Sequence, residues 1–171
     1  MGNIYFEKVS LEQFAKDLRS VIMPHATDEQ IKAYYDAIEL PKRGSVGSAG
    51  YDFHSPIPFE LRSEDWGNVS ITIPTGIRAV MPNDIFLQIV PRSGVGFKTG
   101  VYLANSTGII DADYQNSPNE GHIMVKLCSG FKNLIVEQGD RLVQGIFLKY
   151  FTTDNDNVQD VRTGGFGSTG A

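Results

Sequence analysis

From Gly44 onward the chain is a series of short strand-like segments separated by turns rich in glycine, proline, asparagine and aspartate. Short runs of β-branched, aromatic and other apolar residues between such turns are typical of strands. The predicted strands are residues 50–59, 69–73, 76–81, 85–91, 101–103, 123–127 and 142–151. We predict no helix in this part of the chain. Short strands at near-regular spacing predict an all-β domain of the sandwich, barrel or jelly-roll type.

Two helices are predicted before this β region. Ser10 and Thr27 each precede a glutamine by three residues, which is the spacing of a helix capping box. Apolar residues at helical spacing predict a first helix over residues 11–22, and a second helix is predicted to end before Pro41. Segment 10–40 can dock a partner protein, but we favour packing against the domain's own surface.

Length, charge and cysteine content narrow the class of protein. The 171 residues predict a single domain, 1–171, that is long enough to bury a core. The net charge of −5, without a basic stripe, argues against a nucleic-acid polymer as partner. Cys128 is the only cysteine, so the chain has no internal disulfide and suits a reducing compartment. No apolar run is long enough to cross a membrane and no signal-peptide pattern is present, so we expect a soluble cytoplasmic protein.

One stretch places polar residues inside an apolar region. Residues 105–114 (NSTGIIDADY) lie between strand-like segments and carry two carboxylates followed by a tyrosine. A β-hairpin arm with a polar tip explains this pattern, because aspartate and glycine are common turn residues. A hairpin that forms a binding pocket explains it as well. In that case glycine allows close backbone approach, Asp111 is a base, and Tyr114 is a stacking wall.

Two further segments combine turn residues with groups that can bind anions. Residues 48–52 (SAGYD) open the β region, where an aspartate after glycine is usually a turn residue. Residues 91–94 (PRSG) end a strand with a guanidinium, a hydroxyl and backbone N–H groups. This segment is either an ordinary loop or a nest for phosphate oxygens.

The last two segments lie near the C-terminus. Residues 139–144 (GDRLVQ) are a turn that enters a core strand, with Arg141 as a structural residue and Gln144 polar where an apolar side chain is expected. Residues 164–170 (GGFGSTG) are typical of a disordered tail. Alternatively, the glycines let the tail wrap closely around a ligand that Phe166 covers.

Taken together and in this order, these segments resemble the five motifs of the trimeric deoxyuridine triphosphatases. The matching motifs are residues 49–52, 91–94, 108–114, 139–144 and 164–170. The resemblance runs from about Leu40 to the C-terminus. It implies an all-β distorted jelly roll of the β-clip type, to which the two predicted N-terminal helices are a small insertion. It also implies a homotrimer with shared active sites that hydrolyses dUTP to dUMP and pyrophosphate.

The resemblance also implies a role for each residue of the central motif. Asp111 would be the base that activates a water for attack on the α-phosphorus. Tyr114 would pack flat on the deoxyribose and leave no room for the 2′-hydroxyl of UTP. Uracil would pair with the backbone at Gly108 and Met124, with Asn105 nearby. Cytosine would leave these backbone groups unpaired, and the narrow hairpin would exclude the methyl group of thymine.

The other motifs would bind the triphosphate. The phosphate-binding residues implied are Arg92, Ser93, Gly94, Arg162, Gly167, Ser168 and Thr169. Phe166 would close over the base, so that residues 159–171 form a flexible C-terminal lid. Mg²⁺ would be held mainly by the phosphates, with Asp52 and Gln144 reaching it through water.

The chain departs from the family pattern in three places. The helical segment 10–40 is additional, and residues 115–121 are longer than the usual tight turn after the motif tyrosine. The family arginine ahead of the tail falls on Val161, and Arg162 is one residue closer to Phe166. We predict that the tail shifts by one residue to restore this contact.

Two other functions are compatible with such a scaffold. A deoxycytidine triphosphate deaminase would need a glutamate base and donors matched to cytosine, and the pair Asp111 and Tyr114 argues against it. A regulatory protein would dock a partner through residues 10–40. The sequence is compatible with a cellular protein and with a viral one that acts in the host-cell cytoplasm.

Overall fold

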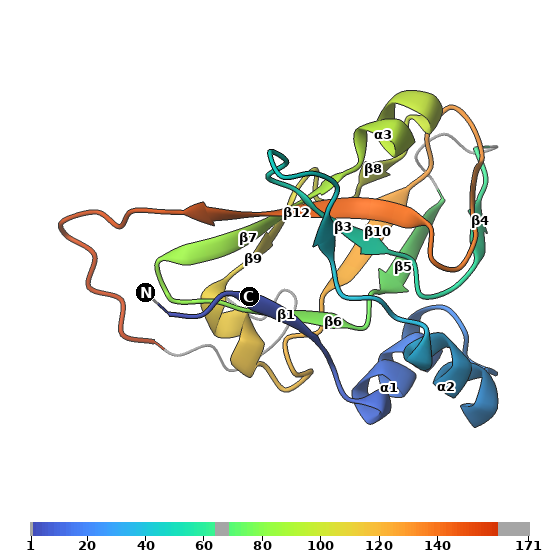
Figure 1. The fold of residues 1–171 in the computed structure, drawn as a ribbon, viewed down its shortest axis with the longest axis horizontal. Helices are drawn as coiled ribbons and strands as arrows, with labels where there is room; N and C mark the ends of the chain where they lie inside the picture. The colour runs from blue at the N-terminus through green and yellow to red at the C-terminus, as the bar shows by residue number, and fades with distance from the viewer. Residues whose placement is uncertain (1, 64–68, 161–171) are drawn as a thin grey trace.

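The computed structural model describes residues 2–63 and 69–160, and its largest sheet is built around one long central strand. This sheet is antiparallel, in the order β2-β3-β12-β7-β9. Its strands are β2 (Lys42–Arg43), β3 (Tyr51–His54), β7 (Ile85–Pro91), β9 (Gly108–Ile110) and β12 (Arg141–Lys149). Figure 1 shows β12 running between β3 and β7. A Cβ atom at Gly145 of β12 would lie 2.9 Å from side-chain atoms of Leu87 and Phe53, so glycine permits this close packing.

Three smaller sheets complete the β structure. Their orders are β5-β10-β8, β1-β6 and β11-β4, and each pairing is antiparallel. Their strands are β1 (Tyr5–Lys8), β4 (Phe59–Leu61), β5 (Ser70–Pro74), β6 (Ile77–Val80), β8 (Tyr102–Leu103), β10 (Met124–Cys128) and β11 (Leu134–Val136). Buried apolar side chains from these sheets form one core. The predicted all-β, jelly-roll-like class is confirmed.

The two predicted N-terminal helices are present as α1 (Leu11–Val21) and α2 (Asp28–Asp36). The Ser10 Oγ accepts a hydrogen bond of 3.1 Å from the backbone N–H of Gln13, and Thr27 forms a complete capping box. Figure 1 shows both helices together at one end of the molecule, where α1 contacts β5. Phe14 and Leu18 of α1 are fully buried, which confirms packing on the domain's own surface. No helix among the described residues is long and apolar enough to cross a membrane.

The structure corrects the prediction that the β region lacks helices. Helix α3 (Ser93–Thr99) follows β7 directly, and a 3₁₀ turn, η1 (Ala112–Asn116), follows β9. The sequence of α3, SGVGFKT, has two glycines and a low intrinsic helix propensity. Its end is set by Gly100, whose φ of 73° places it in the left-handed region.

The single strand predicted over residues 50–59 is also wrong. The segment forms β3 and then β4, which belong to different sheets. Pro56 and Pro58 lie between them and cannot donate backbone hydrogen bonds to a ladder. Ser55 fastens the corner, because its hydroxyl donates to the carbonyl of Ile57 at 2.7 Å and its N–H donates to the carbonyl of Asp140 at 2.8 Å. The short strands β2, β9 and β11 were not predicted.

The stretch 105–114 connects two sheets and is not the tip of a simple hairpin. Before it, β8 pairs with β10, with Leu103 opposite Leu127. Within it, β9 pairs with β7, with Gly108 opposite Ile89. The stretch therefore crosses from the three-stranded sheet to the edge of the five-stranded sheet, where the two sheets diverge.

A buried polar pair joins α1 to the β core. His122 is fully buried just before β10, and its Nδ1 lies 2.6 Å from Oδ2 of Asp17 on α1. Gln13 donates a hydrogen bond of 2.7 Å to the same carboxylate oxygen. Burial pushes the pKa of Asp17 upward, but the hydrogen bonds from His122 and Gln13 outweigh it and hold the pKa below its usual value.

This lowered pKa predicts a specific dependence of stability on pH. A carboxylate whose pKa is lower in the folded than in the unfolded state stabilises the fold above the unfolded value of about 3.9. The stabilisation disappears as the pH falls through the folded-state pKa. We expect Asp17→Asn to reduce the free energy of unfolding at pH 7, and the difference from the wild type to shrink below about pH 4. Urea unfolding between pH 3 and pH 7, with the exposed Asp154→Asn as control, measures this; a difference that stays constant contradicts it.

Candidate active site

An apolar pocket of about 300 Å³ lies where β9 and β10 diverge. Its lining includes Asn105, Gly108 and Met124, so the structure brings together the three residues predicted to contact the base. The remaining lining residues are Ile89, Leu103, Ala104, Ile109, Ile110, Val125 and Lys126. A Cβ atom at Gly108 would lie 3.1 Å from Cβ of Ile89, so glycine keeps β9 close to β7. In the described part of the chain β9 is the edge strand of its sheet, and its outer edge borders the pocket.

The loop that forms one wall of this pocket is fastened to both sheets. The hydroxyl of Thr107 donates to the carbonyl of Ile89 at 3.1 Å and accepts from Nε2 of Gln88 at 3.2 Å. The N–H of Ala104 donates to the carbonyl of Lys126 at 2.9 Å. Between them, Ser106 has a φ of 63°, a left-handed conformation that turns the chain sharply. The wall is therefore held in place before any ligand arrives.

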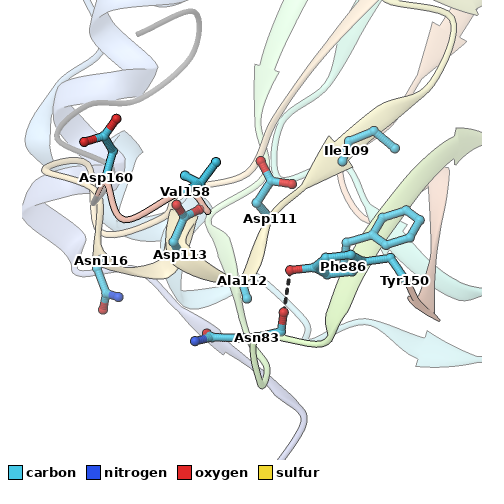
Figure 2. Close-up of a pocket in the computed structure, with 10 residues that line it drawn as sticks. All are labelled: Asn83, Phe86, Ile109, Asp111, Ala112, Asp113, Asn116, Tyr150, Val158 and Asp160. Carbon is cyan, nitrogen blue, oxygen red and sulfur yellow. Dashed lines mark hydrogen bonds between the residues drawn. The ribbon is translucent and has the colours of Figure 1, made fainter. Parts of the chain in front are cut away.

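A second cavity, of about 760 Å³, lies beside the first and contains Asp111. Asp111 follows β9 and precedes η1 with extended backbone angles, and its side chain is exposed. Figure 2 shows that Asp111, Asp113 and Asp160 supply the carboxylates of this cavity, while Phe86 and Tyr150 form an aromatic wall. Ile109 lines both cavities, so they are neighbours on β9.

Sequence reasoning missed the residues that surround Asp111. Asn83, Phe86 and Tyr150 lie at one end of the β7–β12 pair, where the start of β7 pairs with the end of β12. The hydroxyl of Tyr150 donates to the carbonyl of Asn83 at 2.5 Å, and its ring meets Phe86 edge-on with a centroid distance of 6.3 Å (Figure 2). The only signal in the sequence was that these residues lie at or near the ends of predicted strands. Without the strand register, that position does not indicate that they lie near Asp111.

Tyr114 lies deeper than predicted. Its exposed fraction is 4%, and it is not among the described residues that line either cavity. Its hydroxyl donates to the carbonyl of His122 at 2.8 Å and accepts from Nδ2 of Asn119 at 2.8 Å. Packing of this ring against a deoxyribose stays a prediction.

The predicted phosphate and metal residues form a separate group where β3, β12 and the start of α3 meet. Asp52 lies opposite Gln144 in the β3–β12 ladder, and Arg92 immediately precedes α3. The Nε of Arg92 lies 2.7 Å from Oδ1 of Asp52, and Nη1 of Arg141 lies 3.5 Å from Oδ2. Ser93 and Gly94 supply the first turn of α3, whose N–H groups have no acceptor within the helix. None of these residues lines the two cavities around β9.

Asp52 and Gln144 are the two side chains that were predicted to reach a metal ion through water. Among the described residues, no group of three or more histidine, cysteine, aspartate or glutamate side chains is arranged to hold a metal. The carboxylate of Asp52 already contacts two guanidinium groups, which balance its charge. Asp52 and Gln144 can therefore bind the waters of a hydrated Mg²⁺ but not replace its whole shell. Arg162, Phe166, Gly167, Ser168 and Thr169 lie outside the described residues.

The fold and the site define an antiparallel jelly-roll-like protein. Its apolar pocket is large enough for a nucleobase and lies beside an exposed carboxylate. The sequence model of the dUTPase family matches residues 36–170. A deoxyuridine 5′-triphosphate nucleotidohydrolase of Lactococcus lactis is 40% identical over 148 residues, covering 84% of this chain and 96% of the relative. One of Rickettsia canadensis is 39% identical over 141 residues, covering 77% and 88%. The chain belongs to the dUTPase family.

Solved structures agree with this assignment. The crystal structure of the Streptococcus mutans dUTPase is 29% identical and aligns with a TM-score of 0.64, covering 88% of this chain and 99% of that one. The dUTPase of phage φ11 of Staphylococcus aureus, at 17% identity, has the same fold with a TM-score of 0.62 and covers 93% and 97%. The family match begins at residue 36, so α1 lies outside it.

Proposed function

We propose that the protein hydrolyses the α–β phosphoanhydride of dUTP and releases dUMP and pyrophosphate. The observation that carries the proposal is the pocket between the outer edge of β9 and the start of β10. An edge strand has N–H and C=O groups directed outward, and a pyrimidine can pair with them as an added strand would. The names of the relatives, which span most of this chain, support the same substrate.

Selectivity for uracil follows from the fixed polarity of backbone groups. Gly108 and Met124 would present an N–H and a C=O that cannot exchange roles, with Asn105 beside them. Uracil matches this pattern, whereas cytosine reverses it and would leave buried groups unpaired at a cost of about 1–3 kcal/mol each. As the family resemblance implies, a narrow pocket would also exclude the methyl group of thymine.

Asp111 would act as the general base. A carboxylate is ionised at neutral pH and can accept a proton from a bound water while it orients the oxygen. That oxygen would attack the α-phosphorus, the bond from the α-phosphorus to the α–β bridging oxygen would break, and pyrophosphate would leave. The exposure of Asp111 at the edge of the larger cavity supports this role, because the carboxylate can reach water and ligand together.

Arg92, Ser93 and Gly94 would bind the phosphates. The 2.7 Å contact with Asp52 orients the Arg92 guanidinium and leaves its remaining N–H donors for phosphate oxygens. Mg²⁺ bound to the triphosphate would neutralise the phosphate charge, and Asp52 and Gln144 would hold its waters. The tail residues 162 and 166–169 would complete the site as a lid.

Assembly of a homotrimer would bring the phosphate-binding residues Arg92, Ser93 and Gly94 of one subunit next to Asp111 of another. Within one chain these phosphate-binding residues lie apart from Asp111, and none of them lines either cavity around β9. Large apolar side chains are exposed on the same chain, including Phe97 of α3 at 87% and Phe131 at 52%. Apolar surface of this kind is typical of subunit contacts. The predicted partner role of residues 10–40 remains a separate prediction.

A nucleotide panel tests the proposed activity. We expect pyrophosphate release from dUTP with Mg²⁺. The kcat/KM for dTTP, dCTP and UTP should be lower by a factor of roughly 100 or more, because each alters a contact in the pocket. Pyrophosphate and ammonia should be measured in the same reactions. Release of ammonia from dCTP would identify a deaminase and overturn the proposal, as would equal turnover of dUTP and dTTP.

A further inference from the structure

Two segments that this chain has in addition to the family pattern contact each other. Helix α1 belongs to segment 10–40, and residues 117–123 form the long connection from η1 to β10. Glu120 in this connection accepts hydrogen bonds from the N–H of Ser10 at 2.7 Å and from its hydroxyl at 2.6 Å. The connection is therefore joined to the N-terminal cap of α1, which lies 110 residues away in the sequence.

The connection also packs tightly against the 3₁₀ turn that follows Asp111. Gly121 has a φ of 71°, and a Cβ atom there would lie 2.8 Å from Cα of Gln115 and 2.9 Å from the carbonyl of Tyr114. On the other side, Nη2 of Arg78 in β6 donates to the carbonyl of Gln115 at 2.7 Å. The turn is thus held between β6 and the connection.

His122 is the centre of this arrangement, and its surroundings determine its tautomer. The N–H of Gly76 donates to Nε2 at 2.8 Å, so Nε2 carries a lone pair. The ring proton must then be on Nδ1, where it is donated to the carboxylate of Asp17 at 2.6 Å. The ring is fully buried and lies 6.3 Å from that of Phe14, so it has no room to rotate.

The backbone of the same residue contacts the motif tyrosine. The carbonyl of His122 accepts the hydrogen bond from the hydroxyl of Tyr114 at 2.8 Å, while the N–H of His122 donates to the carbonyl of Asn119 at 3.0 Å. The N–H of Tyr114 in turn donates to the carbonyl of Asp111 at 3.1 Å. A continuous series of contacts therefore runs from α1 through His122 and Tyr114 to Asp111.

We propose that Asp17 and His122 are positioning residues, through which α1 sets the placement of Tyr114 and so the selectivity for deoxyribose over ribose. The inference rests on the proposed dUTP hydrolysis and on the predicted packing of Tyr114 against the deoxyribose. Neither residue touches the substrate. If the pair is broken, the carbonyl of His122 loses its fixed place, and the tyrosine ring that it anchors can move away from the sugar. The 2′-hydroxyl of UTP then meets less steric exclusion.

Variants of the pair separate positioning from general destabilisation. His122→Leu removes the contact with Asp17 at nearly unchanged volume, and Asp17→Asn removes its charge. His122→Asn is the conservative variant, because its amide can donate to Asp17 in place of Nδ1. Arg19→Gln is the matched control, because Arg19 joins α1 to Asp28 and to the carbonyl of Ala26 without touching the connection.

The kinetic readout is the ratio of kcat/KM for dUTP to that for UTP. We expect this ratio to fall roughly tenfold in His122→Leu, the loss of about one positioned hydrogen bond, and to recover in part in His122→Asn. Arg19→Gln should lower the melting temperature but keep the wild-type ratio. If Arg19→Gln lowers the ratio as much as His122→Leu does, the pair has only a structural role and the inference is wrong.

Hydrogen exchange tests the mechanical link without any activity. We expect faster amide exchange over residues 112–122 in Asp17→Asn than in Arg19→Gln, when each variant is measured the same number of degrees below its own melting temperature. Unchanged exchange in Asp17→Asn overturns the link. Faster exchange with an unchanged dUTP to UTP ratio overturns the selectivity role. A wild-type protein that does not hydrolyse dUTP overturns the proposed function and the selectivity role, while the exchange result still decides the link.

Discussion

Asp111→Asn is expected to lower kcat for dUTP hydrolysis by roughly a thousandfold, because the amide cannot accept the proton of the attacking water. Asparagine has nearly the same shape as aspartate, so the cavity and the strand β9 should be preserved. Binding of a dUTP analogue with a non-hydrolysable α–β bridge should change little. Single-turnover kinetics measures the chemical step, and calorimetric titration of the analogue measures binding.

The neighbouring carboxylate supplies the control for this prediction. Asp113→Asn removes the same charge from the same cavity two residues further along the chain. We expect a decrease of less than about tenfold, because a change in local charge alone shifts a barrier far less than loss of a base does. Equal losses of activity in the two variants would assign the effect to charge and would show that Asp111 is not the general base.

Mixing two inactive variants is expected to restore activity. If each site takes Asp111 from one subunit and Arg92 from another, random trimers of Asp111→Asn and Arg92→Ala subunits contain some sites with both native residues. In trimers that contain both variants, about one site in three should then be intact. The variants should be co-expressed with different tags and purified through both, and pyrophosphate release compared with that of each parent.

The control for mixing uses two variants at one position. Co-assembled Asp111→Asn and Asp111→Ala subunits should remain inactive, since no trimer of them contains the native aspartate. An inactive mixture of Asp111→Asn with Arg92→Ala would show that both residues of each site come from one chain. That result would contradict shared sites while leaving the proposed reaction intact.

The parts of the structure that were predicted correctly are those set by neighbours in the sequence. The caps of α1 and α2 depend on hydrogen bonds that the Ser10 and Thr27 hydroxyls accept from backbone N–H groups three residues away, and in α2 the Thr27 N–H also donates to Gln30. Most strands were located because apolar residues recur between turn residues. The meeting of Asn105, Gly108 and Met124 in one pocket was anticipated through the family resemblance.

The features that were missed depend on strand register. The aromatic wall beside Asp111 exists because β12 pairs with β7 so that Leu148 lies opposite Phe86, which brings Tyr150 alongside. The ion pair joins Asp52 on β3 to Arg92, the residue directly after β7, and these two strands flank β12. Helix α3 forms despite its two glycines, because context outweighs intrinsic propensity in so short a segment.

The all-β class, the two N-terminal helices and the residue types available for chemistry can be derived from the sequence alone, because they follow from periodicity, capping and motif order over short distances. Tertiary structure alone decided that the stretch 105–114 bridges two sheets and that Asp17 meets His122 across 105 residues. Such contacts depend on how separate segments pack, and no local pattern encodes the packing. For that reason the place of Tyr114 could be read only from the folded chain.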